Sequence, residues 1–120
     1  MALFKRCLIP LILSGQKTQT RRAHKRRWII GHTYKIKDQY LSKGLGTIKI
    51  TRAFKQRLGD INEIDAQKEG FANRIEFIKA WTLINKQIWN PDTVVTVYEF
   101  VLIEKKRSTP SIYGKAVLNN

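Results

Sequence analysis

Apolar and polar residues alternate along several short segments of the chain, and this period of two is typical of strands with one buried face. The alternation is clear over 33–37 and over 47–54, and residues 2–5 fit a shorter strand. The segment 93–103 is apolar at nearly every position. A strand of that kind is buried on both faces, so it is expected to be central in a sheet or part of a closed barrel.

A short helix is expected near the N-terminus, over 7–14. Pro10 fits the first turn of this helix, and Gly15 is a suitable left-handed residue just past its end. Cys7 lies at the start of this apolar stretch and is interpreted as a small core residue. The segment 16–28 that follows is polar and without periodicity, which predicts a loop or an irregular strand.

Two further helices are expected over 61–69 and 74–86. Each begins with the spacing of an N-cap and its partner three residues later, at Asp60 with Glu63 and at Asn73 with Glu76. The apolar stripe of the second helix is expected at Ile75, Ile78, Trp81 and either Leu83 or Ile84.

Short strands with a few helices predict an α+β fold, a small curled or barrel-like sheet of mixed strands with two to three packed helices. The 120 residues suffice for one domain. We place that domain at 1–104. Residues 105–120 then form a basic C-terminal extension, either a loose tail or a late packing segment.

A single cysteine and the absence of Cys/His clusters argue for a reducing compartment and against a zinc module. The early apolar run 8–13 is interrupted by Pro10 and is too short to span a membrane. We therefore expect a cytoplasmic protein that needs no cofactor and no metal, and that does not bind membranes.

Charge is unevenly distributed along the chain. Residues 1–60 carry 15 Lys and Arg against 2 Asp and Glu, whereas residues 61–120 carry 8 against 7. A one-sided basic field is typical of proteins that bind polyanions, because contacts with phosphates release condensed counterions. The alternative is a generally basic surface that only limits aggregation.

The stretch from Gly15 to Arg22 combines this charge with hydroxyl groups. If it is extended, Thr20 faces away from Lys17, but in a tight loop the two side chains converge. A Thr hydroxyl needs a base to become a nucleophile, and a Lys can be that base only if burial or nearby cations lower its pKa. The other interpretation is that Lys17, Arg21 and Arg22 contact phosphate while the threonines bond to the local backbone.

Three other features are candidates for function. Glu69 lies at the expected end of a helix, where the macrodipole disfavours a carboxylate. The basic and aromatic run 24–28 has the composition of a surface that holds single strands, although Trp28 also fits a core position. His24 lacks a second residue at metal-ligand spacing. Glu99, in an apolar strand, either pairs with Arg or Lys or lines a pocket.

Several segments together resemble the family of ASCH domains, which belongs to the PUA-like superfamily. The similarity covers about residues 3–103 and is closest to short, single-domain, archaeal-type members. It is carried by Phe4-Lys5, Leu11-Ile12-Leu13-Ser14-Gly15-Gln16-Lys17-Thr18-Gln19-Thr20-Arg21-Arg22, Trp28-x-x-Gly31, Thr47-Ile48-Lys49-Ile50-Thr51, Arg57-Leu58-Gly59-Asp60-Ile61, Glu69-Gly70-Phe71 and Val97-Tyr98-Glu99-Phe100.

The resemblance implies a small β-barrel with a cleft for nucleic acid or a nucleobase. Members of the family differ in activity. Some are regarded as RNA-binding, at least one behaves as a ribonuclease, and short bacterial members remove acetate from N(4)-acetylcytidine. The catalytic set of those amidohydrolases matches Lys17, Thr20 and Glu69.

We therefore expect binding of RNA, in preference to DNA, or of a modified nucleotide in a basic cleft. The alternatives are an amidohydrolase and, third, a ribonuclease. The expected nucleic-acid contacts are Lys5, Arg21, Arg22, Lys25, Arg26, Arg27 and Arg52.

Overall fold

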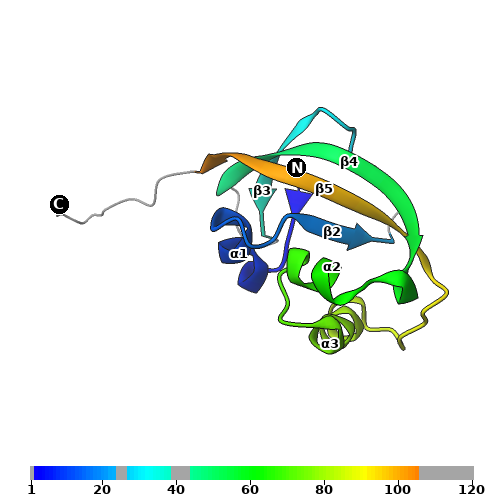
Figure 1. The fold of residues 1–120 in the computed structure, drawn as a ribbon. Helices are drawn as coiled ribbons and strands as arrows, with labels where there is room; N and C mark the ends of the chain where they lie inside the picture. Colours follow the sequence, from blue (N-terminus) through cyan, green and yellow to red (C-terminus); the bar gives the residue numbers. More distant parts are fainter. Residues whose placement is uncertain (1, 24–26, 39–43, 106–120) are drawn as a thin grey trace.

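The computed structural model describes residues 2–23, 27–38 and 44–105. Five strands and three α-helices make up this part of the chain, which confirms the α+β class (Figure 1). The strands are β1 (Ala2–Leu3), β2 (Gln19–Arg22), β3 (Thr33–Lys37), β4 (Gly46–Arg57) and β5 (Val94–Lys105). The helices are α1 (Ile9–Leu13), α2 (Glu63–Lys68) and α3 (Arg74–Asn85), with 3-10 turns at Arg6–Leu8 and Leu58–Asp60.

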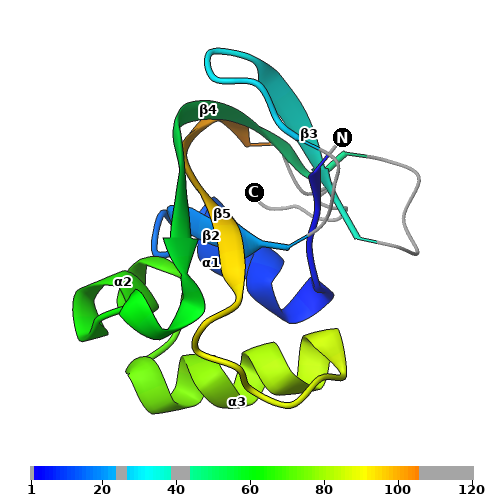
Figure 2. The ribbon, with the colours of Figure 1, turned by 90° about the vertical axis from the view of Figure 1, so that its right-hand side faces the viewer.

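The strands form one mixed sheet in the order β1-β3-β4-β5-β2. The β1–β3 pair is parallel and the other pairs are antiparallel. β4 and β5 are the long central strands and bend together over the molecule, while α2 and α3 lie on the side away from β3 (Figures 1 and 2). The apolar segment predicted to be central is therefore β5, flanked by β4 and β2, but its expected burial on both faces is wrong, because Val94, Val101 and Ile103 are exposed.

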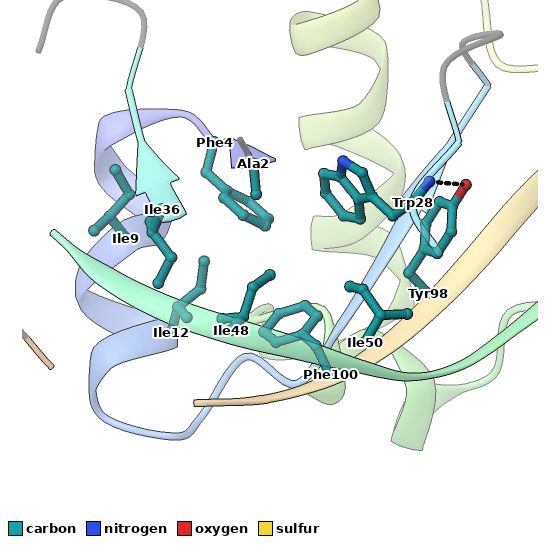
Figure 3. Close-up of a cluster of buried hydrophobic side chains, with 10 residues drawn as sticks. All are labelled: Ala2, Phe4, Ile9, Ile12, Trp28, Ile36, Ile48, Ile50, Tyr98 and Phe100. Atoms are coloured by element: carbon teal, nitrogen blue, oxygen red, sulfur yellow. Dashed lines mark hydrogen bonds between the residues drawn. The ribbon is translucent and has the colours of Figure 1, made fainter. Parts of the chain in front are cut away.

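The curved sheet encloses one hydrophobic core (Figure 3). Trp28 is buried in it, as one of its two interpretations expected, with its ring centroid 5.0 Å from that of Tyr98. The Tyr98 hydroxyl accepts a hydrogen bond from the backbone N–H of Trp28, at 3.3 Å. The cluster consists of Ala2, Phe4, Ile9, Ile12, Trp28, Ile36, Ile48, Ile50, Tyr98 and Phe100.

A second core lies between the sheet and the helices α2 and α3, and it centres on Phe77. The Phe77 ring packs against Trp81 and Trp89, with 6.3 Å between ring centroids in each pair. The buried members of this cluster are Leu58, Ile61, Ala66, Phe77, Trp81 and Val95.

The expected start of α2 is wrong by two residues. Asp60 belongs to the 3-10 turn that ends β4, and the side chain of Asn62 caps the helix instead by accepting from the N–H of Asp65. The expected cap of α3 is confirmed, because Asn73 accepts from the N–H of Glu76 at 2.9 Å.

The phase of the apolar stripe on α3 is also partly wrong. Trp81 is buried and Ile78 is half-buried as expected, but Phe77 takes the position expected for Ile75. Ile75, Leu83 and Ile84 are exposed. The helix carries apolar residues around most of its circumference, so periodicity alone does not fix which face turns inward.

Cys7 is exposed in the 3-10 turn before α1, so its expected core position is wrong. The buried residues of this region are Ile9 and Ile12, on the inner face of α1. Of the expected C-terminal extension, only Lys105 is described, as the last residue of β5. No helix in the described ranges is long and apolar enough to cross a bilayer.

The orientation of α3 predicts unequal effects for two substitutions on that helix. Phe77→Ala removes a ring that is 3% exposed and is expected to lower the free energy of unfolding by about 3–5 kcal/mol. Ile75→Ala, on the solvent face, is expected to change it by less than about 0.5 kcal/mol. Urea denaturation followed by tryptophan fluorescence measures both values. Equal effects of the two substitutions would contradict the assigned face.

Candidate functional site

Lys17 is held by the backbone of three neighbouring segments. Gly15, with φ of +84°, ends the α1 region and turns the chain back, so that the N–H of Lys17 donates to Leu11 O at 2.9 Å. Thr18 then bonds to the end of α2 and to β5, with its N–H donating to Lys68 O and its carbonyl accepting from the N–H of Phe100. These bonds fix Lys17 between α1, α2 and the sheet.

Glu69 is brought to Lys17 by the end of α2. It is the C-cap residue of that helix, as expected, and is followed by Gly70 with φ of +105°. A Cβ at Gly70 would lie 3.0 Å from Leu11 Cδ1, so only glycine combines this backbone conformation with the close approach to α1.

Lys17 and Glu69 form a buried ion pair across 52 positions of sequence. The ammonium donates to Glu69 Oε1 at 3.2 Å, to Glu69 O at 2.8 Å and to Gln19 O at 2.9 Å. Both side chains are less than 5% exposed. Burial lowers the pKa of Lys17 below its ordinary 10.5; Glu69 opposes this change, and Arg22 and Arg21 add to it.

Arg21 completes the charge cluster from the opposite side of Glu69. Its guanidinium is fully buried and donates to Glu69 Oε2 at 3.0 Å and to Gln56 Oε1 at 2.7 Å. It also donates to the side chain of Gln19, and it lies 3.5 Å from a carboxylate oxygen of Asp65. This guanidinium therefore has no exposed surface to offer to a phosphate.

Arg22 points to the other side of β2 and lies against two aromatic rings. Its Cζ is 4.6 Å from the ring centroid of Phe4 and 4.8 Å from that of Trp28, within the range of cation–π contacts. Its Nη2 donates to Leu3 O at 2.7 Å and its Nε to Thr20 Oγ1 at 3.2 Å. Burial lowers the pKa of Arg22 to about 10. This side chain links the edge strands β2 and β1 across the opening of the curved sheet.

A pocket of about 330 Å³ brings these groups together. It lies between the N-terminal segment, β2 and α3, where the two hydrophobic cores meet. Its volume falls within the range of small-molecule sites, which are mostly apolar with a few placed polar groups. The lining residues are Leu3, Phe4, Lys5, Arg6, Leu8, Lys17, Thr20, Arg21, Arg22, Ala23, Asp38, Glu69, Phe71, Phe77, Ala80, Trp81, Ile84 and Asn85.

Lys17, Thr20 and Glu69 thus line one pocket, although they come from three different segments. Lys17 precedes β2, which begins only at Gln19, so the alternation of an extended strand does not separate it from Thr20. Within the described ranges, the hydrogen bonds of the Lys17 ammonium go to Gln19 and Glu69 and not to Thr20.

The expected nucleic-acid contacts occupy different places. Lys5 is exposed and lines the pocket, whereas Arg27 lines a separate groove and Arg52 lines neither hollow and pairs with Glu99. Lys25 and Arg26 lie outside the described residues, as does His24. Sequence reasoning missed Asp38, which lines the pocket and pairs with Arg6 at 3.0 Å. A lone acid that follows Lys37 carries no signal of this role in the sequence.

Glu99 is half-buried and pairs with Arg52 at 3.5 Å, in agreement with one of its two expected placements. Its carboxylate also accepts from Gln19 Nε2 at 3.1 Å. Gln19 thereby connects the pocket cluster to the outer surface of the sheet. In the described part of the chain, no group of three or more His, Cys, Asp or Glu could hold a metal ion.

No family model matches the sequence, and no curated protein matches it. Solved structures with a similar fold include the following two. One is a protein from Enterococcus faecalis V583 described by the family model DUF984, with 21% identity, a TM-score of 0.63, and coverage of 82% of this chain and 68% of that one. The other is an ASCH domain from Lactobacillus crispatus JV V101, with 17% identity, a TM-score of 0.62, and coverage of 82% and 71%.

The chain has an ASCH-like fold. The fold expected from the sequence motifs is therefore found in a structural neighbour. At these identities the similarity concerns the fold alone, and the function has to be argued from the site.

The buried ion pair predicts a strong effect of Glu69→Gln on stability. The substitution leaves Lys17 and Arg21 buried without their shared carboxylate, and we expect it to lower the free energy of unfolding by about 3–5 kcal/mol at pH 7. The matched control is Glu76→Gln, which breaks the exposed pair with Lys79 on α3 and should cost less than about 1 kcal/mol. Urea unfolding at pH 7 measures both. A loss for Glu69→Gln no larger than that of the control would contradict the buried-cluster assignment.

Proposed function

We propose that this protein binds a nucleotide, either a unit of an RNA strand or a modified nucleotide, in the pocket beside Lys17. The observation that supports this proposal is the composition of the pocket wall. Five cationic side chains and two carboxylates line it together with Phe4, Phe71, Phe77 and Trp81. An apolar and aromatic wall suits a planar base, and the cationic surplus suits a phosphate.

The distribution of the cations supports an orientation for the ligand. Lys17 and Arg21 are buried and share the carboxylate of Glu69, so they offer little to a phosphate. Lys5 is exposed and forms no ion pair within the described ranges, and the Arg6 side chain is 68% exposed. The base would therefore enter toward Phe71 and Phe77, with the phosphate at the mouth near Lys5.

A charge reversal at the mouth tests this orientation. Lys5→Glu is expected to weaken binding of a nucleoside 5′-monophosphate roughly tenfold and to reduce the salt dependence of binding. Lys49→Glu, at an exposed lysine of β4 outside the pocket, is the matched control. Calorimetric titrations at two salt concentrations measure both effects. The proposal fails if no nucleotide binds the wild type, or if the control loses as much affinity as Lys5→Glu.

A second candidate function is hydrolysis of an amide on a modified base, such as N(4)-acetylcytidine. The observation that favours it is the presence of Lys17, Thr20 and Glu69 in one pocket, with the pKa of Lys17 lowered by burial. Neutral Lys17 would take the proton of the Thr20 hydroxyl, and Thr20 Oγ1 would attack the amide carbonyl. The amine would leave with that proton, and water would then release the acyl group from Thr20.

This mechanism predicts a defined pH dependence. The base must be unprotonated, so the rate should rise with pH and reach its plateau below pH 10.5, because burial lowers the pKa of Lys17 from that value. Release of cytidine from N(4)-acetylcytidine measures the rate. Thr20→Ala should abolish it, whereas Thr18→Ala, a neighbouring threonine outside the pocket wall, should keep most of it. Equal rates in all three proteins, or none in the wild type, would reject hydrolysis of this amide.

A further inference from the structure

A second hollow lies behind the pocket, on the other side of Trp28. It is a more open groove of about 430 Å³ between the segment 27–30 and the strands β4 and β5. Its walls are mostly apolar, and they include Ile29 and Ile30, each 55% exposed. Ile29 and Ile30 thus give the groove an exposed apolar wall, and contiguous apolar surface inside a hollow is the kind that marks binding sites.

The charge of this groove has one sign. Its basic lining residues are Arg27 and Lys55, and no Asp or Glu lines it. Neither of these two side chains forms an ion pair within the described ranges, and both are exposed. By contrast, the neighbouring cations Arg52 and Arg57 are paired with Glu99 and Asp92. The groove therefore keeps its positive charge available to a ligand.

The groove and the pocket share a wall made by Trp28 and Arg22. Arg22 lines the pocket, and its Cζ lies 4.8 Å from the Trp28 ring, which itself lines the groove. Tyr98, also in the groove wall, pairs across the sheet with Thr20 of the pocket. Along the chain, Ala23 of the pocket and Arg27 of the groove are four residues apart, which limits their separation to about 14 Å.

We propose that this groove is a second binding site, and that it holds the nucleotides next to the one bound in the pocket on a single strand. The bases would lie against Ile29 and Ile30, and the phosphates would contact Arg27 and Lys55. Proteins that bind single strands without sequence preference combine a positively charged groove with side chains against which the bases lie, usually aromatic ones; here Ile29 and Ile30 would supply that apolar surface. The ligand class is thus a single-stranded oligonucleotide. This inference rests on the proposed nucleotide binding in the pocket and extends it to a strand.

The test compares ligands of increasing length on the same protein. Calorimetry gives the affinity for uridine 5′-monophosphate, and fluorescence anisotropy gives the affinity for labelled single-stranded oligouridylates of two, four and eight nucleotides. The wild type is expected to bind the longer strands at least about tenfold more tightly than the mononucleotide. The double substitution Arg27→Glu with Lys55→Glu is expected to remove that gain and to leave mononucleotide affinity unchanged.

Two controls separate the groove from general charge. Lys49→Glu changes an exposed lysine that, like Lys55, lies on β4 but lines neither hollow. This variant should retain most of the gain in affinity with oligonucleotide length. Ile30→Ser tests the apolar wall without a change of charge. It should reduce the gain in affinity with oligonucleotide length and leave the salt dependence of that affinity unchanged. The double substitution should lower the slope of log affinity against log salt by about 1.4, because each phosphate contact on a single strand contributes about 0.7.

The outcomes distinguish the two proposals. If the mononucleotide binds but longer strands gain nothing, the groove proposal is overturned and the pocket proposal stands. If the gain persists in the double variant, or is lost equally in Lys49→Glu, the groove proposal is likewise overturned. If long strands bind through the groove while the mononucleotide does not bind, the pocket proposal fails; the groove is then a strand-binding site, but its placement next to a nucleotide in the pocket is overturned. If the groove captures an acidic protein segment instead of RNA, the assigned ligand class is wrong.

Discussion

The buried ion pair between Lys17 and Glu69 fixes the relative positions of the segment before β2 and the end of α2. Two buried cations, Lys17 and Arg21, share this one buried carboxylate, and the half-buried Asp65 adds a weaker contact at 3.5 Å. Buried ion pairs of this kind are weak evidence for stability, because the loss of hydration offsets much of the attraction. The fold satisfies their hydrogen bonds with main-chain carbonyls of Gln19 and Glu69. A cluster that costs free energy and lines a pocket is better explained by what the pocket does than by stability.

The same constraint explains why adjacent basic residues differ so much. β2 alternates its side chains, so Arg21 turns under α2 to meet Glu69, while Arg22 turns into the curved sheet to meet Phe4 and Trp28. Both are largely buried, and neither is a surface arginine. The acidic residues of the second half of the chain pair with cations of the first half at Lys17, Arg21, Arg52 and Arg57. Of these four cations, Lys17 and Arg21 are buried while Arg52 and Arg57 are exposed, so only part of the positive charge seen in the sequence is internal.

Local signals predicted the elements whose structure is decided locally. The alternation over 33–37 matches β3, and the Asn73 cap matches the start of α3, because both depend on neighbouring residues. The sequence over β2 predicts only a loop or an irregular strand, because these four residues become a strand through pairing with β5, far along the chain. For the same reason, spacing alone left the relation of Lys17 to Thr20 open. The position of Glu69 at a helix end was visible in the sequence, but its partner was not, since 52 positions separate it from Lys17.

The arrangement of the two hollows follows from how the sheet is closed. β1 and β2 are the sheet edges, and the Arg22 guanidinium spans them by donating to Leu3 O from its stacked position on the aromatic rings. The Arg22 side chain lies between the two edge strands and lines the pocket. Trp28, on the other side of Arg22, lines the groove. Continuous main-chain pairing of β1 with β2 would have sealed this opening. The incomplete closure of the sheet therefore leaves the pocket open between β1 and β2, and a ligand that occupies both the pocket and the groove must pass the wall of Arg22 and Trp28.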